Sequence, residues 1–177
     1  MDIISHGLWG GITLGRENKK SFWTSFIFGI APDFLAFAPF FASVFLGFAE
    51  FPKFSTEPPI PDGIPAYVHN VYSFTHSLII FAVVFGLIVF ANKFLSPPSL
   101  KLRRTPWEMS AWGLHILFDI PTHSNAFFPT PFLWPYSSAH IDGIPWAHPA
   151  IFIPNIAILI ILYLYFFAYK KRETNHF

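Results

Sequence analysis

The apolar run from Phe22 to Ala49 is the feature that most restricts how this chain can fold. Its only charged residue is Asp33. A helix needs about 20 apolar residues to cross the hydrocarbon core of a bilayer, and this run is long enough to do so. Pro32 and Pro39 are expected to kink or split the helix, because proline removes a backbone hydrogen bond from a helix interior.

The composition agrees with a membrane location. Hydrophobic residues make up 53% of the 177 residues and charged residues only 12%, about half the charged fraction of an average soluble domain. So few charges would not cover the surface of a soluble protein of this size. The sequence therefore predicts an all-α integral membrane protein in which residues 1–177 form one domain. A net charge of +1 argues against nucleic acid as a partner.

Other apolar runs predict the remaining helices. They are Ile3–Leu14, Leu78–Ala91 with a continuation to Leu95, Trp107–Ile120 and Ala150–Tyr169. Asp2 can cap the first of these helices, which is too short for a standard span. The proline-rich stretches Phe51–Asn70 and Ser124–His148 are expected to be loops. Together these segments predict a multi-pass transmembrane helical bundle of about five helices, the first one short.

The basic residues predict the orientation of the helices. Ten of the 11 Lys and Arg residues fall in three clusters, at positions 16–20, 93–104 and 170–172. Lys and Arg concentrate on the cytoplasmic side of membrane proteins, which places both proline-rich loops on the outer side. The sequence thus predicts an inner-membrane protein with an outer N-terminus.

The stretch from Gly113 to Ser124, GLHILFDIPTHS, holds the most distinctive polar pattern. His115, Asp119 and His123 are spaced four residues apart in otherwise apolar sequence. At 3.6 residues per turn, their side chains lie near one face of a helix. Histidine and carboxylate on one face of an apolar helix are the ligands that a buried metal site needs.

Three more polar residues are expected at the same depth. Asp33 lies halfway along the longest apolar run, where an ionised carboxylate costs about 2.5–3.5 kcal/mol and marks a functional site. His6 lies near the outer end of the first helix. His76 is expected in the first turn of the third helix, which Thr75 or Ser73 would cap. The predicted topology brings these residues to the central helix, in the outer, periplasmic half of the bundle.

This convergence predicts a metal site with histidine and carboxylate ligands only, since the chain has no cysteine. The candidate ligands are His6, Asp33, His76, His115, Asp119 and His123. Zn²⁺ fits this mixed nitrogen and oxygen set best, with Mn²⁺ or Fe²⁺ as alternatives, and the number of ligands allows one or two ions. Asp119 and Asp33 are also the candidate catalytic residues, because a metal would activate a water and a carboxylate would accept its proton.

The order of short motifs resembles that of a known family, the membrane-bound metal-dependent hydrolases (the DUF457 or YdjM-like group of bacterial and archaeal inner-membrane proteins). The matching residues are His6, Gly29–Asp33 (GIAPD), Thr75–Ser77 (THS), His115–Asp119 and Trp134–Pro135. Many members carry His-Arg ahead of the THS motif, where this chain has Val71 and Tyr72. The resemblance implies hydrolysis. By analogy, the H-x-x-x-D helix is also similar to that of zinc-dependent phospholipase C and P1 nuclease, which implies a phosphate ester or phosphodiester.

These observations favour a hydrolase that acts on a phosphate or carboxylic ester of a lipid-like substrate in the membrane. Two other functions would use the same residues. A transporter or channel for metal ions or protons would need a polar route to the cytoplasmic side. A non-catalytic scaffold would hold a fully ligated metal, because catalysis requires an open coordination position.

Overall fold

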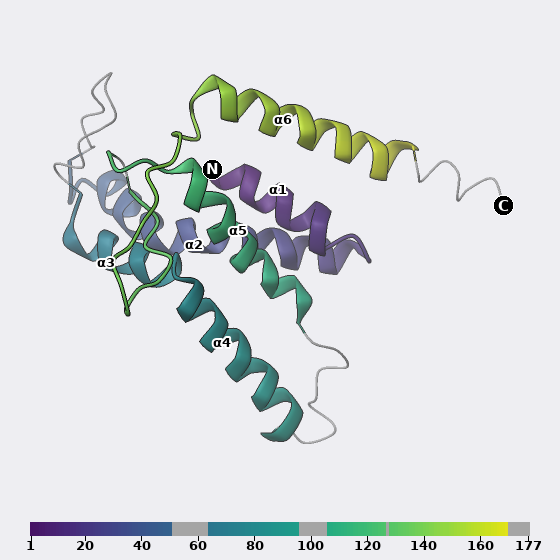
Figure 1. The fold of residues 1–177 in the computed structure, drawn as a ribbon, viewed down its shortest axis with the longest axis horizontal. Coiled ribbons are helices and arrows are strands. Elements are labelled where there is room, and N and C mark those ends of the chain that lie inside the picture. Colours follow the sequence, from purple (N-terminus) through teal and green to yellow (C-terminus); the bar gives the residue numbers. More distant parts are fainter. Residues whose placement is uncertain (51–63, 96–105, 127, 170–177) are drawn as a thin grey trace.

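The computed structural model describes residues 1–50, 64–95, 106–126 and 128–169. In these ranges the chain forms six α-helices and no β-strand, in agreement with the predicted all-α class (Figure 1). The helices are α1 (Ile3–Leu14), α2 (Lys19–Phe45), α3 (Ala66–Thr75), α4 (Leu78–Phe90), α5 (Ser110–Thr122) and α6 (Pro149–Tyr163). The π-helical turns Ala91–Leu95 and Leu164–Tyr169 extend α4 and α6, and the 3₁₀ turn Trp107–Met109 precedes α5.

The first two helices test the local predictions. α1 has the predicted bounds, and the carboxylate of Asp2 caps it by accepting a hydrogen bond from the Ser5 backbone N–H at 2.9 Å. α2 runs through Pro32 and Pro39 as one helix, so of the two predicted outcomes, a kink or a split, the split is wrong. In apolar surroundings a helix keeps its remaining backbone hydrogen bonds past a proline, because no water is present to replace them.

α3 includes residues 66–70, for which the sequence predicts a loop. This segment gains burial by folding as a helix, since Val68 and Tyr72 are only 0% and 2% exposed. Both pack in a core cluster that includes Phe40 of α2 and Phe128 from the segment after α5. The first part of the predicted loop, residues 51–63, lies outside the described residues.

The prediction for the start of α4 is also wrong. His76 lies in the break between α3 and α4 rather than in the first turn of α4. Ser77, and not Thr75 or Ser73, caps the helix: its hydroxyl accepts a hydrogen bond from the Ile80 N–H at 3.2 Å. The break therefore presents the imidazole from an irregular stretch of backbone between two helices.

α1 and α2 pack very closely because glycine lines their contact. A Cβ on Gly29 would lie 2.5 Å from the backbone oxygen of His6, and a Cβ on Gly10 would lie 2.6 Å from that of Ser25. Neither position has room for a side chain. Small residues allow such contacts between membrane helices, where van der Waals packing drives association. The contact at Gly29 fixes His6 against the middle of α2.

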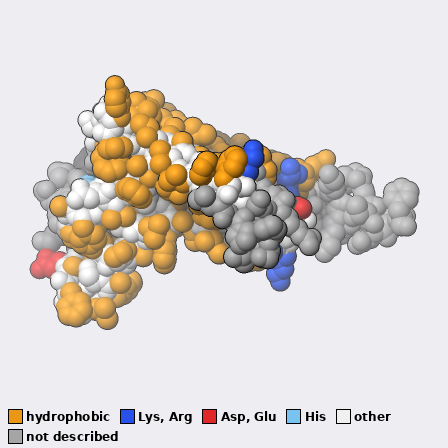
Figure 2. Space-filling view, turned by 90° about the horizontal axis from the view of Figure 1, so that it is seen from below, with side chains coloured by type: hydrophobic (Ala, Val, Ile, Leu, Met, Phe, Trp, Pro, Cys, Tyr) orange, Lys and Arg blue, Asp and Glu red, His pale blue; other side chains and the backbone are white. Residues whose placement is uncertain are grey.

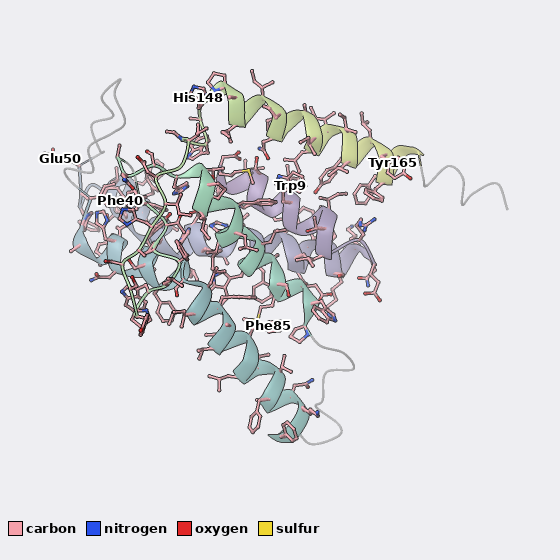
Figure 3. All side chains as sticks on the ribbon, viewed as in Figure 1. Trp9, Phe40, Glu50, Phe85, His148 and Tyr165 are labelled. Carbon is pink, nitrogen blue, oxygen red and sulfur yellow. The ribbon has the colours of Figure 1, made fainter. Side chains whose placement is uncertain are left out.

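α6 lies along α1 (Figure 1, Figure 3). Hydrogen bonds of polar side chains join the two helices. The Asn155 side chain accepts a hydrogen bond from the indole N–H of Trp9 and donates one to the Ser5 hydroxyl, each at 2.8 Å. Towards the C-terminal end of α6, the Tyr163 hydroxyl donates to the Leu8 carbonyl at 2.9 Å. These hydrogen bonds orient α6, whose other face carries exposed apolar side chains.

Replacing Asn155 with alanine removes two hydrogen bonds between α6 and α1. We expect the free energy of unfolding in detergent to fall by about 1 kcal/mol, since hydrogen bonds between membrane helices contribute about 0.6–1.7 kcal/mol. Unfolding followed by circular dichroism measures the change. Asn70→Ala, on the exposed surface of α3, is the matched control and should leave the stability unchanged. Equal stability of wild type and the Asn155 variant would contradict this role.

Two helical segments are long and apolar enough to cross a membrane, α2 and Pro149–Phe167. α3 and α4 pass the same test together, but they are bent by 58° at their break and form either a broken span or a re-entrant loop. α1 and α5 have 12 and 13 residues, a rise of about 18–20 Å against a hydrocarbon core of about 30 Å. The described residues thus support two or three of the predicted membrane crossings.

Large apolar side chains cover much of the surface (Figure 2). Phe45, Leu87 and Ile161, from three different helices, are 85%, 62% and 63% exposed. Apolar surfaces of this extent mark contact with a membrane or a partner. The buried polar residues lie instead on α1, α2 and α5, in the break between α3 and α4, in the segment after α5 and, as Asn155, on the face of α6 towards α1.

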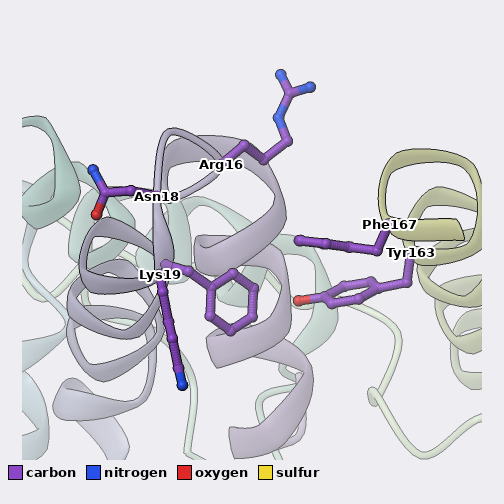
Figure 4. A pocket seen from close by; sticks show the side chains of 7 residues that line it. Arg16, Asn18, Lys19, Tyr163 and Phe167 are labelled. Carbon is purple, nitrogen blue, oxygen red and sulfur yellow. The ribbon is translucent and has the colours of Figure 1, made fainter. Parts of the chain in front are cut away.

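A cavity of about 430 Å³ lies between the turn that joins α1 to α2 and the C-terminal part of α6 (Figure 4). Phe22, Tyr163 and Phe167 contribute apolar rings to its wall, and Arg16 and Lys19 add basic side chains. The cavity lies at the C-terminal end of α1, whereas the site described below lies near its N-terminal end.

Candidate metal centre

Four side chains from distant parts of the chain meet, as the sequence predicts. Asp33 comes from the middle of α2, His76 from the break between α3 and α4, and His115 and Asp119 from successive turns of α5. One ligand atom from each lies within 4.8 Å of the others, and such a group can hold a metal ion. The side chains of His76, His115 and Asp119 are fully buried, whereas that of Asp33 is 13% exposed.

Backbone carbonyls fix the tautomer of both imidazoles. The Nδ1–H of His115 donates to the carbonyl of Gly29 at 2.7 Å, and that of His76 faces two acceptors at 3.0 Å, the carbonyl of Tyr72 and the hydroxyl of Thr75. A carbonyl only accepts, so in each neutral ring Nδ1 carries the proton and Nε2 presents a lone pair. The two Nε2 atoms face each other at 3.0 Å. Two lone pairs at this distance repel, so either a proton or a metal ion lies between the two nitrogens.

The distances among the ligand atoms fit one small cation. Four ligands at about 2.0–2.1 Å from a tetrahedral zinc ion are about 3.3–3.4 Å from one another. His115 Nε2 lies 3.1 Å and His76 Nε2 lies 3.4 Å from Asp119 Oδ2. Asp33 Oδ1 lies 3.3 Å from His76 Nε2 and 3.8 Å from His115 Nε2. Asp119 Oδ2 is buried without a hydrogen bond from the described residues, which suits an oxygen that faces a metal.

The other two predicted ligands contact the second oxygen of Asp119. His6 Nε2 lies 2.8 Å and His123 Nε2 lies 3.5 Å from Asp119 Oδ1. The His6 ring also stacks on the His115 ring, with centroids 3.7 Å apart. The amino group of Met1 contacts the same oxygen. His6 and His123 therefore lie beside the four-residue group rather than within it.

His123 follows the last turn of α5 and lies outside the candidate spans. Its Nδ1–H donates to the Phe128 carbonyl at 2.8 Å, and the Tyr72 hydroxyl lies 2.8 Å from the same nitrogen. Burial lowers the pKa of His123, so the ring is neutral at neutral pH. With Nδ1 protonated, Nε2 presents its lone pair towards Asp119.

Tyr72 is a site residue that the sequence pattern does not single out. Its ring stacks on His76 with centroids 3.7 Å apart, and its hydroxyl donates to the Phe128 carbonyl at 3.0 Å. This position supplies a ring that supports one histidine and a hydroxyl beside another. The one signal in the sequence is its place four residues, about one helical turn, before His76.

Hydrogen bonds from the surrounding elements hold the break between α3 and α4 in place. The Thr75 hydroxyl donates to the Pro32 carbonyl at 3.2 Å, and the Trp112 indole N–H donates to the Thr75 carbonyl at 2.6 Å. The Ser77 hydroxyl donates to the carbonyl of Trp134. These contacts join α2, α5 and the segment after α5 around the break, and so position its histidine.

Comparison with protein-family models, curated proteins and solved structures finds no match to this chain. Its function is therefore argued from the site. The site is a group of two histidines and two aspartates that can hold a metal ion, in an all-helical chain with two helices long enough to span a membrane.

Proposed function

We propose that this chain is an integral membrane hydrolase that depends on a divalent metal ion held by Asp33, His76, His115 and Asp119. The observation that carries the proposal is the four-residue group itself, in which two imidazole Nε2 atoms face each other at 3.0 Å beside a buried carboxylate oxygen that accepts no hydrogen bond from the described residues. Zn²⁺ suits these donors best, with Mn²⁺ or Fe²⁺ as alternatives. When bound, the ion would supply a water of lowered pKa and polarise the ester oxygen.

The two carboxylates have different surroundings and therefore different roles. Asp119 is fully buried and lies against both imidazoles, so it holds the ion and the ligand rings. Asp33 is the one member of the group with an exposed edge. In the proposed hydrolase it would accept the proton of the attacking water. The water oxygen bonds to the phosphorus or carbonyl carbon, the bond to the leaving alcohol breaks, and the proton held by Asp33 passes to that alcohol.

The position of Asp33 supports a lipid-like substrate. The residues that follow it on α2, Phe34 and Leu35, are each 56% exposed, so the open edge of the group adjoins an apolar surface. An ester on a lipid head group would reach the site along such a surface. The positive-inside pattern supports a site in the outer half of an inner-membrane protein. The motif resemblance to membrane-bound metal-dependent hydrolases points to the same chemistry.

A second function is favoured by the number of donors. Four protein ligands complete the tetrahedral shell of a structural zinc ion, whereas a catalytic ion keeps one position open. If Asp33 ligates permanently, the metal would only join α2, α5 and the α3–α4 break. The chain would then be a metal-stabilised membrane scaffold without catalytic activity.

Metal analysis of the detergent-purified protein tests the site. We expect stoichiometric Zn²⁺, Mn²⁺ or Fe²⁺ in the wild type and a loss of more than about tenfold in His76→Ala, because even outer partners of a ligand contribute that much to affinity. His140→Ala removes an exposed loop histidine and should keep the full metal content. Hydrolysis of phosphatidic acid, a phosphodiester phospholipid and a carboxylic ester lipid in vesicles is measured with the same proteins, with and without chelator.

The outcomes separate the functions. Hydrolysis that needs metal and is lost in His76→Ala supports the hydrolase. Stoichiometric metal without hydrolysis of any of the three lipids supports the scaffold. A protein that neither carries nor takes up metal contradicts both, and the buried histidines and aspartates would then be tested for proton or ion flux in proteoliposomes.

A further inference from the structure

The cavity beside the turn that joins α1 to α2 lies at the same end of both candidate membrane-spanning helices. Lys19, the first residue of the α2 span, and Phe167, the last residue of the α6 span, both line it (Figure 4). Where two spans end side by side, the hydrocarbon core of a bilayer gives way to the lipid head groups. The cavity is therefore at the depth of the head groups, at the other end of α1 from the metal centre.

Three aromatic rings form the apolar part of the cavity wall. The Phe22 ring of α2 meets the rings of Tyr163 and Phe167 of α6 edge to face, with centroids 6.3 and 6.0 Å away. The Tyr163 hydroxyl donates its hydrogen to the Leu8 carbonyl, so this tyrosine offers a ligand its ring but no proton. Such a wall suits the hydrocarbon of a lipid.

Basic side chains form the polar part of the wall. Arg16 and Lys19 line the cavity, and none of the lining residues that the structure describes is acidic. The Arg16 guanidinium lies over the Phe166 ring of α6, 4.1 Å from its centroid. Stacking uses the face of a guanidinium, and the N–H donors at its edge match two oxygens of a phosphate. Arg16 is thus held against α6 in a form that can bind an anion.

We propose that this cavity binds one anionic phospholipid, with its phosphate on Arg16 and Lys19 and the start of an acyl chain against the three rings. The volume of about 430 Å³ is within the range of about 300–1,000 Å³ that is usual for ligand pockets. Basic pockets between membrane helices on the cytoplasmic side are typical sites for anionic head groups, and the positive-inside pattern supports that side for residues 16–20. The lipid would join the α1–α2 turn to α6. This inference goes beyond the proposed function and does not depend on it.

Native mass spectrometry of the delipidated protein tests the site, by titration with phosphatidylglycerol and with phosphatidylcholine of the same acyl chains. Chelator in every sample prevents metal-dependent hydrolysis of the lipid. We expect one phosphatidylglycerol to bind about 25-fold more tightly than phosphatidylcholine, because each of two basic residues contributes about fivefold. Arg16→Gln should weaken phosphatidylglycerol alone, by about fivefold. Lys93→Gln is the matched control, since Lys93 is also exposed and lies over an aromatic ring, that of Phe94, but does not line this cavity.

Each result decides for or against the lipid site. Equal affinity of the wild type for the two lipids overturns the proposal, and this comparison needs no variant. Displacement of phosphatidylglycerol by an equal concentration of glycerol 3-phosphate would show that the cavity takes a soluble phosphate ester and no lipid. Full affinity in Arg16→Gln, or the same loss in Lys93→Gln, would place the lipid elsewhere. None of these outcomes bears on the metal centre, whose failure would show in the metal analysis.

Discussion

Asp119→Asn is expected to abolish metal binding and hydrolysis while the helices stay folded. The amide has nearly the shape of the carboxylate, so the packing of α5 is kept. It lacks the charge that draws a cation, and its NH₂ group cannot ligate. All four histidines that lie against the two oxygens of Asp119 lose this carboxylate in the variant. We expect the metal affinity to fall by more than the about 10–100-fold that loss of an outer hydrogen-bond partner costs.

Metal content and the circular dichroism spectrum of the same purified sample check this expectation. Asp142→Asn is the matched control, because Asp142 is exposed in the segment before α6 and accepts a hydrogen bond from the Asn125 N–H at 2.8 Å. This variant should keep the metal content of the wild type. Full metal content in Asp119→Asn would show that the ion does not bind at this carboxylate.

Gly29→Ala is expected to disrupt the same centre without changing any ligand. The added methyl group would lie 2.5 Å from the backbone oxygen of His6, and the nearest atoms around it all belong to backbone. α1 must therefore move away from α2. The Gly29 carbonyl accepts the hydrogen bond that fixes the tautomer of His115, so the movement disturbs histidines on both sides of Asp119. Overpacking of this kind costs about 1–3 kcal/mol. Because the ligands are in place only while α1 and α2 stay in contact, we expect this cost to weaken metal binding by about 5- to 150-fold.

Gly86→Ala is the matched control for this substitution. Gly86 lies in α4, where a Cβ would meet no atom within 4 Å. Alanine there should stabilise the helix by about 0.5–1 kcal/mol and leave metal binding as it is. Isothermal titration with Zn²⁺ compares the two variants. If Gly29→Ala binds the ion as tightly as Gly86→Ala does, close contact between α1 and α2 is not needed for the site.

The sequence predicts the four meeting residues because their positions follow from simple rules. The spacing of His115 and Asp119 places them on one face of a helix in any fold. Asp33 is conspicuous as a lone charge in an apolar run. Their shared depth follows from the lengths of the helices and from the distribution of basic residues. The bounds of α1 are predictable for the same reason, since a capping aspartate precedes a short apolar segment.

What the sequence does not predict depends on contacts between distant segments. α3 is helical because Val68 and Tyr72 pack in a core cluster with residues of other segments. The sequence before Val71 contains no pattern that predicts this packing. The tautomers of His76 and His115 depend on carbonyls, which every residue carries, so no residue type identifies the acceptors. No sequence pattern marks Gly29 as a contact residue, because its role depends on the close approach of the α1 backbone at His6.

The shortness of α1 and α5 has a consequence for the lipid around the protein. Helices of 12 and 13 residues fall short of the hydrocarbon thickness by about 10 Å. Hydrophobic mismatch of this size is relieved by local thinning of the bilayer. With the orientation that the basic residues predict, thinning brings the aqueous boundary closer to the end of α5 that carries Asp119 and His123. For the proposed hydrolase, water would then enter through the thinned region, while the lipid chain stays in the neighbouring leaflet.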